Sequence, residues 1–329
     1  MNLYKINYYN QNGKGKYDNL NKVKNSDNKK IAILFHGMAG RSLNYTWEKI
    51  QENLIDVLLD NDYNVDIFMH TWLSRTGKFI KFEQGTEYSV DVDNEIYELI
   101  PCKKYLAEYQ EDIGNVTHRS NGITKDKFYN TFIYTMRLYK TIDQVTKLME
   151  EEGINYDAVF IMRMDLYFPK KLDINEVEDV IRNKNLFYNQ LIDWFPRNSS
   201  GAADNNTAVR SSNVFGVGDS YILSSMKIAH KWGRRFSYME ELMKEGKIID
   251  AWWIGYMNSY NPFTNIWGSG ECYLGYVMDE SCKWKKSSMI YAKLRSNKTF
   301  NWAISHVLKD LTPEELNKHN EWKKKHNIS

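Results

Sequence analysis

Continuously apolar runs alternate with stretches in which apolar residues recur every three or four positions, and this alternation organises the first half of the chain. The run Ile31–Phe35 is typical of a strand buried on both faces of a parallel sheet. Apolar residues at helical spacing follow from Trp47 and predict a helix that ends near Asn61. The run Val65–His70 predicts a second strand. The order strand, helix, strand indicates an α/β fold with a mostly parallel, doubly wound sheet.

The middle of the chain repeats this pattern with a longer helix. One apolar face extends from Thr124, a suitable N-cap, to Gly153, which suits a left-handed helix end. The run Ala158–Met162 predicts a third buried strand directly after it. Residues 73–122 are less regular, so no element is assigned to them.

The last part of the chain is aromatic-rich and is expected to be largely helical. Helices are predicted from about Asp219 to Tyr260, and Thr312 opens a capping box that starts the last helix. Residues 193–213 are polar and rich in turn-forming residues, which predicts a surface loop. Residues 1–29 are rich in Lys and Asn and are expected to form a flexible or loosely attached lead-in.

The charge balance and the cysteine content argue against several classes of partner and site. The chain has 44 Lys and Arg against 42 Asp and Glu, a formal charge of +2, which argues against a nucleic-acid partner. Its three cysteines form no CxxC pair, so neither a disulfide framework nor a thiolate zinc site is indicated. We predict no signal peptide and no membrane span. The expected location is the cytoplasm or, for a viral protein, the host cytoplasm or the virion; the oligomeric state is open.

Polar residues follow each of the three predicted strands, and they are the candidates for chemistry. In open α/β sheets, ligands bind beyond the carboxyl ends of the strands. The three segments are His36–Arg41, His70–Trp72 and Arg163–Asp165. A turn with satisfied polar side chains explains any one of them, but three such segments at one edge favour a binding site.

Three stretches of the sequence match landmarks of one known family. They are FHGMAGR at 35–41, DIFMHTW at 66–72 and YDAVFIMRMDLYF at 156–168. Their order and spacing resemble the GT-A type nucleotide-sugar glycosyltransferases, particularly small soluble ones of large DNA viruses and bacterial surface-polysaccharide loci. The resemblance covers about residues 30–280. It implies a Rossmann-like sheet and transfer of a monosaccharide from a nucleotide-diphosphate sugar, UDP favoured over GDP, to a hydroxyl of a glycan or glycoprotein.

The resemblance also implies how the chain is divided. Residues 30–280 would form a GT-A-like catalytic domain, with a nucleotide-binding part at about 30–170 and an acceptor part at about 171–280. Residues 281–329 would form a C-terminal helical extension packed on the same domain. Tryptophans of the acceptor half are candidates for stacking on sugar rings. They are Trp194, Trp232, Trp252, Trp253 and Trp267.

Asp165 is the metal ligand that the resemblance implies. A diphosphate leaving group carries dense negative charge, which a carboxylate-bound Mn²⁺ or Mg²⁺ would neutralise as the glycosidic bond breaks. The family at large has an Asp-x-Asp pair, and Arg163 replaces its first Asp here. The Arg163 guanidinium can bind a phosphate bidentately without metal, or it can form an ion pair with a neighbouring carboxylate. The dependence on metal therefore stays open.

The other strand-end segments suggest contacts to the nucleotide. Gly37 and Gly40 allow the backbone to approach a base or phosphate closely, and Arg41 can reach the pyrophosphate. Three further residues are candidates for binding the nucleotide, although the interior of the protein is the commoner place for a Trp: His36, His70 and Trp72.

An inverting enzyme also needs a carboxylate that deprotonates the acceptor hydroxyl. The candidates are Glu271, Asp193 and Asp250, and the sequence does not rank them. Glu271 lies in a stretch similar to the family's P-E-x-x-L element. Residues 213–218 resemble its N-D-x-F-x-x-G stretch, but Val214 stands where an Asp is often found.

Three alternatives accompany this interpretation. A degenerate transferase fold that binds a glycan or a protein is motivated by Arg163. An α/β-hydrolase is suggested by LFHG at 34–37, but no G-x-S-x-G nucleophile elbow follows. Asp91-Val92-Asp93 is a literal Asp-x-Asp, but no buried strand precedes it, so we expect a solvated acidic turn instead of a metal motif.

Overall fold

A computed structural model describes most of the chain. The described residues are 20, 27–83, 86–111, 127–189, 220–244, 282–294, 298–300 and 304–328. Within them, seven strands form one sheet in the order β10-β8-β9-β6-β1-β2-β5. These strands are β1 Lys30–Gly37, β2 Asn64–Leu73, β5 Lys104–Tyr109, β6 Ala158–Arg163, β8 Leu186–Asn189, β9 Tyr221–Ser224 and β10 Lys283–Lys286.

The sheet is mostly parallel, as the sequence predicts. β1 pairs in parallel with β2 on one side and with β6 on the other, and β5 extends the parallel set beyond β2. Only β9 runs the other way, between β6 and β8, while β10 pairs in parallel with β8. The expected α/β class, with a mostly parallel sheet flanked by helices, is confirmed.

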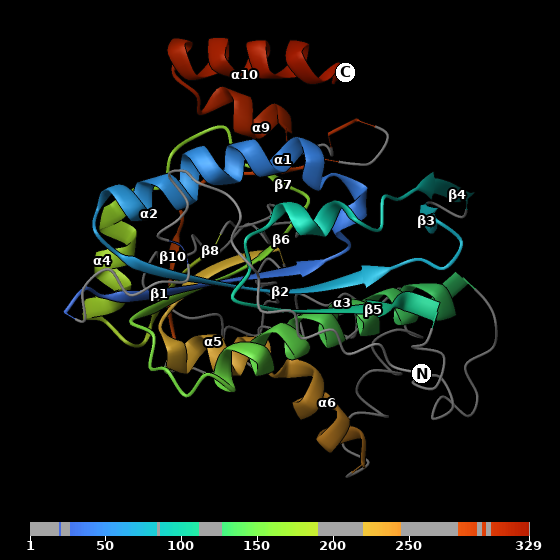
Figure 1. Cartoon of the computed structure of the whole chain (residues 1–329), viewed down its shortest axis with the longest axis horizontal. Helices are drawn as coiled ribbons and strands as arrows, with labels where there is room; N and C mark the ends of the chain where they lie inside the picture. Colours follow the sequence, from blue (N-terminus) through green and yellow to red (C-terminus); the bar gives the residue numbers. More distant parts are fainter. Residues whose placement is uncertain are drawn as a thin grey trace, which may run out of the picture.

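Helices cover both faces of the sheet (Figure 1). On one face lie α3, Lys127–Glu150, and α5, Met226–Gly233. The other face carries a continuous helical segment made of α1 Leu43–Ile50, the π-helical turn η3 Gln51–Ile55 and α2 Asp56–Asp60, together with α4 Ile174–Arg182. A short 3-10 turn, η2 Ala39–Arg41, precedes α1.

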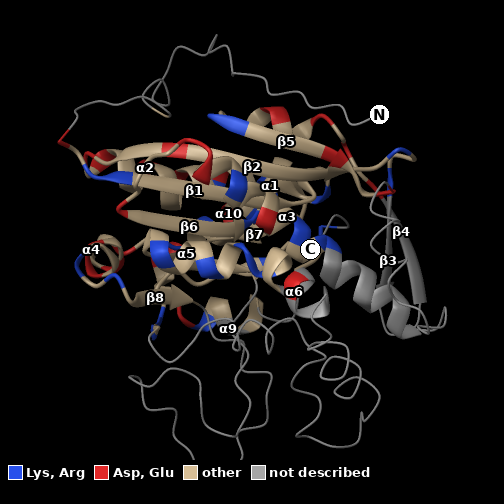
Figure 2. Cartoon of the chain, turned by 90° about the horizontal axis from the view of Figure 1, so that it is seen from below, with Lys and Arg blue, Asp and Glu red and all other residues tan. Residues whose placement is uncertain are grey.

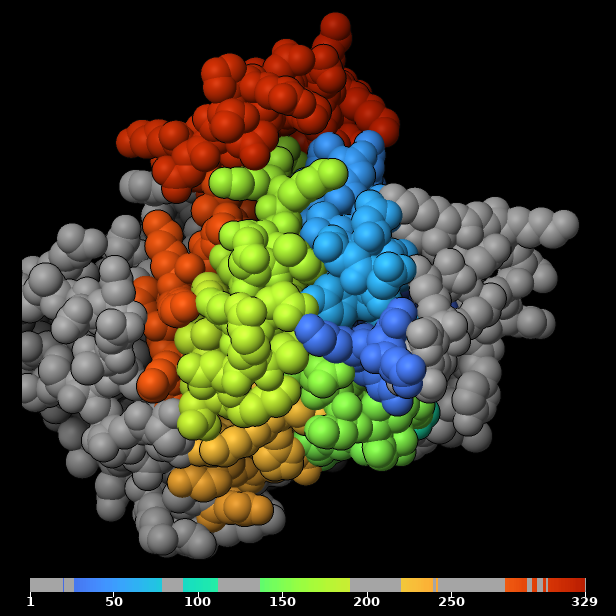
Figure 3. Space-filling model, turned by 90° about the vertical axis from the view of Figure 1, so that its left-hand side faces the viewer, coloured from blue at the N-terminus to red at the C-terminus, as the bar shows by residue number. Residues whose placement is uncertain are grey.

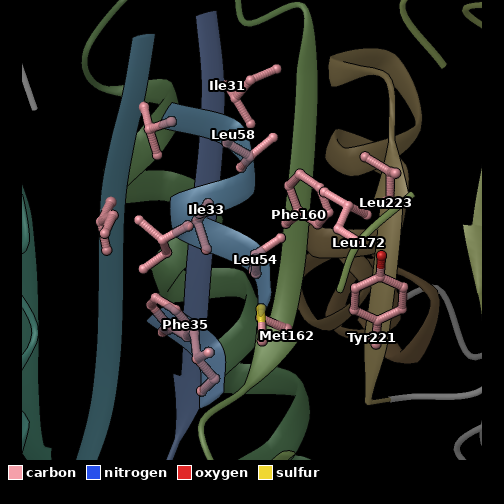
Figure 4. Close-up of a cluster of buried hydrophobic side chains, with 14 of the residues drawn as sticks. Ile31, Ile33, Phe35, Leu54, Leu58, Phe160, Met162, Leu172, Tyr221 and Leu223 are labelled. Atoms are coloured by element: carbon pink, nitrogen blue, oxygen red, sulfur yellow. The ribbon is translucent and has the colours of Figure 1, made fainter. Parts of the chain in front are cut away.

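The period-two alternation of β1 divides the core into two layers. Ile31, Ile33 and Phe35 pack with Leu54 and Leu58 of the helical segment above the sheet (Figure 4). The intervening residues Ala32 and Leu34 pack against α3 and α5 in a second cluster. Each face buries apolar side chains, which is why the strand is a continuous apolar run.

Most of the predicted elements are present, and one region was interpreted wrongly. The helix from Trp47 to Asn61 and the long helix that ends before Gly153 both form, and Gly153 has the expected positive φ of 65°. The prediction of helices from Asp219 onward is wrong at its start, because Tyr221–Ser224 is the strand β9. A run of four mainly apolar residues does not distinguish a strand from a buried helix by periodicity. Helices α5 and α6, Arg235–Lys244, follow it.

The chain's last described residues contribute strands as well as helices. After β10, strand β11, Ala292–Lys293, pairs with β7, Leu166–Tyr167. Helices α9, Ile304–Lys309, and α10, Pro313–His326, then pack outside α1, and the capping box predicted at Thr312 is formed. Figure 3 shows this C-terminal segment, in red, lying across the blue and yellow-green segments of the core. The proposed domain boundaries themselves stay predictions.

Two remaining features lie near β2. The hairpin of β3, Lys78–Glu83, and β4, Thr86–Asp91, projects beyond the carboxyl end of β2, and the 3-10 turn η4, Ile96–Leu99, follows it (Figure 1). Basic and acidic residues are interspersed along the described elements, in keeping with the near balance of charge (Figure 2). None of the helices in the described ranges is long and apolar enough to cross a membrane.

Candidate functional site

The three predicted segments meet at the carboxyl edge of the sheet. The register of β1 with β2 places His36 opposite His70, and the register of β1 with β6 places His36 opposite Arg163. The three residues thus form one row across three adjacent strands. The spatial convergence that the sequence suggested is present, and the polar groups on this row fall into two clusters.

The first cluster, which we call the arginine cluster, consists of Arg41, Arg163 and Asp165. Arg163 Nε donates to Asp165 Oδ1 at 2.8 Å and Nη2 donates to Oδ2 at 2.6 Å, a bidentate pair. Arg41 Nη1 lies 3.8 Å from the same Oδ2. The Asp165 side chain is 7% exposed, whereas Arg41 is 14% and Arg163 is 20% exposed. The two arginine side chains are therefore more exposed than the carboxylate with which they pair.

The electrostatics of Asp165 are dominated by these cations. Burial alone raises the pKa of this carboxyl group, but Arg163, then Arg41 and Lys293, outweigh burial and hold the pKa well below its usual range. Asp165 is therefore ionised at any physiological pH. Asp165 is thus the carboxylate on which the charges of Arg163, Arg41 and Lys293 act together.

The backbone around Asp165 is held from three sides. Thr46 Oγ1 of α1 donates to the carbonyl oxygen of Met164 at 2.7 Å. The Leu294 amide, next to β11, donates to the Asp165 carbonyl oxygen at 2.9 Å, and the Arg163 amide donates to Ser220 at 3.0 Å. Two of these three contacts join segments separated by more than one hundred residues, and together the three fix the turn between β6 and β7.

The turn is also supported from the C-terminal helix. Tyr167, two residues after Asp165, stacks on Trp322 of α10 with ring centroids 4.1 Å apart, and its hydroxyl lies 2.7 Å from His319 Nδ1. Both Tyr167 and His319 are buried. Burial lowers the pKa of His319 to about 4, so the imidazole is neutral at pH 7.

The second cluster, which we call the histidine cluster, is closed. His70 Nδ1 lies 2.7 Å from Thr141 Oγ1 on α3, and Nε2 lies 2.9 Å from Glu108 Oε2 on β5. Trp72 packs edge-on against His70 and donates its indole N–H to the carbonyl oxygen of Arg137. His70 is fully buried and burial lowers its pKa, against the opposing effect of Glu108.

Several residues that were predicted to bind the nucleotide are therefore buried and make their contacts within the protein. His70 and Trp72 join β2 to β5 and α3, and His36 is buried with its ring centroid 6.4 Å from that of Trp232. Trp232, one of the tryptophans predicted to stack on sugar rings, is in the core and lies against the guanidinium group of Arg235. Trp232 is not on a sugar-binding surface.

Glycine is favoured at positions 37 and 40, at the end of β1 and in the turn after it, for two different structural reasons. Gly37 has a φ of +116°, which favours glycine, and a Cβ there would meet nothing within 4 Å. At Gly40 a Cβ would lie 2.5 Å from the carbonyl oxygen of Asp93. Gly40 thus admits the backbone of residue 93, so the close approach that we expected for a ligand is made there by the chain itself.

The literal Asp-x-Asp lies beside this loop, and its described contacts are local. Asp91 ends β4, and both Asp91 and Asp93 are exposed. Asp93 Oδ1 accepts from the Glu95 amide at 2.9 Å, which makes a local turn. These contacts agree with the expected solvated acidic turn.

Asp165 is not arranged as a ligand of the predicted Mn²⁺ or Mg²⁺. Both of its oxygens face guanidinium groups, and positive neighbours disfavour a cation at the same place. Within the described ranges, no group of three or more His, Cys, Asp or Glu side chains is placed to hold a metal ion. The residues described here therefore do not fit the predicted cation.

The remaining candidates lie outside the described residues. They are the three candidate bases Asp193, Asp250 and Glu271, the stretch 213–218, and the tryptophans at 194, 252, 253 and 267. Sequence reasoning missed Thr141 and Lys293, which contribute to the two clusters from α3 and β11. No local pattern marks them, because each reaches its cluster only through the tertiary fold.

Comparison with known proteins does not assign this chain to a family. No family model matches the sequence, and no curated protein does. Among solved structures, an active-site mutant of LgtC, a GT-A glycosyltransferase, is similar with a TM-score of 0.35 at 7% identity. The match covers 78% of this chain and 72% of that one. A TM-score of this size does not assign the chain to a fold family.

Proposed function

We propose that the protein is a glycosyltransferase. It would transfer a monosaccharide from a nucleotide-diphosphate sugar, UDP favoured over GDP, to a hydroxyl of a glycan or glycoprotein. The observation that carries the proposal is the arginine cluster, in which Arg41 and Arg163 lie together, partly exposed, at the carboxyl edge of the sheet. The resemblance of the three strand-end segments to GT-A enzymes supports the same reaction class.

The transfer reaction requires positive charge next to the oxygen of the leaving diphosphate. The bond between the anomeric carbon and the diphosphate oxygen breaks, and its electron pair leaves with the diphosphate. The acceptor oxygen bonds to the anomeric carbon, and its proton passes to a base, for which Asp193, Asp250 and Glu271 are the candidates. Guanidinium groups fixed next to the leaving oxygen stabilise the charge that develops there. In this scheme Arg41 and Arg163 bind the diphosphate.

A donor panel tests the proposal. The full chain is incubated with UDP- and GDP-sugars, with and without Mn²⁺, and release of the free nucleotide is measured. We expect release from one donor class, faster with a suitable acceptor. The Arg163→Gln variant should reduce release by at least tenfold, because a charge-assisted hydrogen bond contributes about 1.5–3 kcal/mol. Arg182→Gln is the matched control, since Arg182 also pairs with an aspartate but precedes β8 at the opposite edge.

A binding module is the second candidate function. Arg163 stands where the family has an Asp and pairs with Asp165, and this departure from the Asp-x-Asp pattern is the observation that favours it. Calorimetry separates the two functions. A protein that binds a glycan but neither nucleotide sugars nor free UDP and GDP would be a binding module. The hydrolase alternative gains no support, because the amide of Gly37 in the LFHG segment donates to Thr141 Oγ1 at 3.2 Å, within the protein.

A further inference from the structure

Helix α10 is docked on the protein by a narrow stripe of ring side chains. Most of its sequence, PEELNKHNEWKKKH, is polar, and the residues that it buries are His319 and Trp322. His326 is partly buried and follows Trp322 at helical spacing, so the three rings share one face of the helix. Because this face has little apolar surface, specific contacts must set the position of the helix.

On one side, this stripe contacts β7, the strand that follows Asp165. Trp322 stacks on Tyr167, and His319 Nδ1 lies 2.7 Å from the hydroxyl oxygen of the same tyrosine. Phe300 packs edge-on against the Tyr167 ring, with centroids 5.2 Å apart. Tyr167 is fully buried and lies two residues after Asp165. A displacement of α10 would therefore change the position of β7.

On the other side, α10 contacts α1, the helix that follows Arg41 (Figure 1). Glu48 of α1 accepts from Lys325 Nζ at 2.8 Å and lies 3.2 Å from His326 Nε2. The His326 ring packs edge-on against Tyr45, with centroids 5.9 Å apart. Tyr45 lies four residues after Arg41, about one helical turn. The helix α10 thus joins the two elements that lead away from the arginine cluster.

We propose that α10 positions the arginine cluster by holding β7 and α1 in one arrangement, and that Tyr167 is the positioning residue through which it acts on Asp165. Its consequence for sugar transfer rests on the proposed function, whereas its effect on the geometry of the cluster does not. The quantity that α10 would set is the separation of Arg41 Nη1 from Asp165 Oδ2, which is 3.8 Å.

This separation depends on how the two elements are held. At 3.8 Å the ion pair is longer than a hydrogen bond, so the elements that carry Arg41 and Asp165 determine its length. Within the core, Thr46 Oγ1 of α1 donates to the carbonyl oxygen of Met164 at 2.7 Å and joins the elements at one point. Helix α10 joins them at a second point, outside α1. Two points of contact restrict rotation as well as separation, and groups that stabilise a transition state need such fixed geometry.

The Nε–H resonance of Arg163 reports this geometry without any ligand, because Nε donates to Asp165 Oδ1 at 2.8 Å. The resonance is recorded by NMR on the full chain and is assigned by its absence in Arg163→Lys. Tyr167→Phe keeps the ring stack and removes the hydroxyl contact with His319, whereas Trp322→Leu removes the stack. We expect the resonance to shift in both variants, and to shift more in Trp322→Leu.

Tyr156→Phe is the matched control. Tyr156 is also buried, and its hydroxyl donates to Asp66 Oδ2 at 2.7 Å, but it precedes β6 at the opposite edge of the sheet. This variant should leave the Arg163 resonance in place. Circular dichroism and thermal denaturation show that each variant is folded and how much stability it loses. An unchanged resonance in both α10-contact variants, with a loss of stability like that of the control, would overturn the inference and leave the proposed function standing.

Kinetics of nucleotide release from the accepted donor test the consequence for transfer. In Tyr167→Phe, kcat should fall about fivefold or more while the donor KM changes less than about twofold, because preorganised charge acts mainly on the transition state. Tyr156→Phe should keep the wild-type kcat. Shifted resonances with an unchanged kcat would overturn the inference. Shifted resonances in a protein whose wild type releases no nucleotide from any donor would overturn the proposed function and leave the positioning of the cluster by α10 standing.

Discussion

The arginine cluster and the histidine cluster occupy the same row at the carboxyl edge, yet they are built differently. In the histidine cluster, His70 is fully buried and both of its ring nitrogens have partners within the protein, Thr141 and Glu108. In the arginine cluster, the carboxylate is buried while the two arginine side chains are partly exposed. Position in the fold is therefore not enough to identify a functional residue.

The difference shows what separates a structural polar group from a candidate binding group. The polar atoms of His70 join β2, β5 and α3 and present no surface to a ligand. Buried polar groups that are satisfied within the chain stabilise one packing arrangement. Arg41 and Arg163 instead are partly exposed side chains that pair with one buried carboxylate. The predictions below test this contrast, beginning with the largest effect.

Removal of the Asp165 carboxylate should have the largest effect. In Asp165→Ala, Arg163 and Arg41 lose the anion between them, and breaking a buried ion pair from one side costs about 3–5 kcal/mol. Because both cations are partly exposed, we expect the lower end, about 3 kcal/mol, in urea denaturation. Added pyrophosphate should restore more stability to the variant than to the wild type. Equal responses to pyrophosphate would contradict an anion site at this cluster.

The support of the arginine cluster by α10 should appear as a dependence of stability on pH. The folded-state pKa of His319 is about 4, below the ordinary value of about 6.5 in an unfolded chain. Between these values the unfolded state binds more protons, so the contribution of His319 is complete above pH 6.5 and is lost as pH falls toward 4. The loss is at most about 3 kcal/mol.

The His319→Gln variant isolates this contribution. The free energy of unfolding of wild type and variant is measured from pH 7.5 to pH 4.5, and the two curves should converge as the pH falls. Parallel curves would show that His319 does not titrate in this range. His70, whose pKa is also lowered by burial, changes both curves in the same direction and cancels in the difference.

Replacement of Gly40 or Gly37 by alanine should reduce the stability of the protein by a smaller amount. Gly40→Ala should cost about 2–3 kcal/mol, because the new methyl group overlaps the backbone of Asp93 at 2.5 Å and that segment must shift. Gly37→Ala should cost about 1–2 kcal/mol, since the space is open and only the positive φ is unfavourable. Thermal denaturation of the two variants measures the order. A larger loss for Gly37→Ala would mean that the loop packs differently from this description.

The elements that periodicity predicted well are those that are buried on both sides. β1 and β6 contain continuous apolar runs, β2 is mainly apolar from Val65 to Met69 apart from Asp66, and α3 carries a long helical face, so local sequence and tertiary position agree. The edge strands β5 and β10 were not predicted. KWKK is mostly lysine, and KYLAEY contains Lys104 and Glu108, so neither is a continuous apolar run, and pairing with β8 and β2 makes them strands.

The candidate site was predictable only up to its location. Strand ends identified Arg41, Arg163 and Asp165, and the spacing of Arg163 and Asp165 allowed the ion pair that the structure shows. The sequence could not indicate that Asp165 faces two arginines, since Arg41 lies more than one hundred residues away. It also could not separate the closed His70 from an open ligand site, because Glu108 belongs to a strand that periodicity did not reveal.

Glu108→Gln should have the smallest effect and tests the histidine cluster most directly. Gln keeps an oxygen that accepts from His70 and removes only the charge, which is 2.9 Å from His70 Nε2 and 3.7 Å from Lys140. Because the Glu108 side chain is partly exposed, we expect a loss of less than about 1 kcal/mol at pH 7.5. The carboxylate raises the pKa of His70 against burial, so its removal should lower that pKa further, which an NMR titration of the imidazole would show. A loss as large as that of Asp165→Ala would mean that the histidine cluster, too, depends on an ion pair, and the contrast between a cluster held by the hydrogen bonds of a buried histidine and one held by ion pairs would no longer hold.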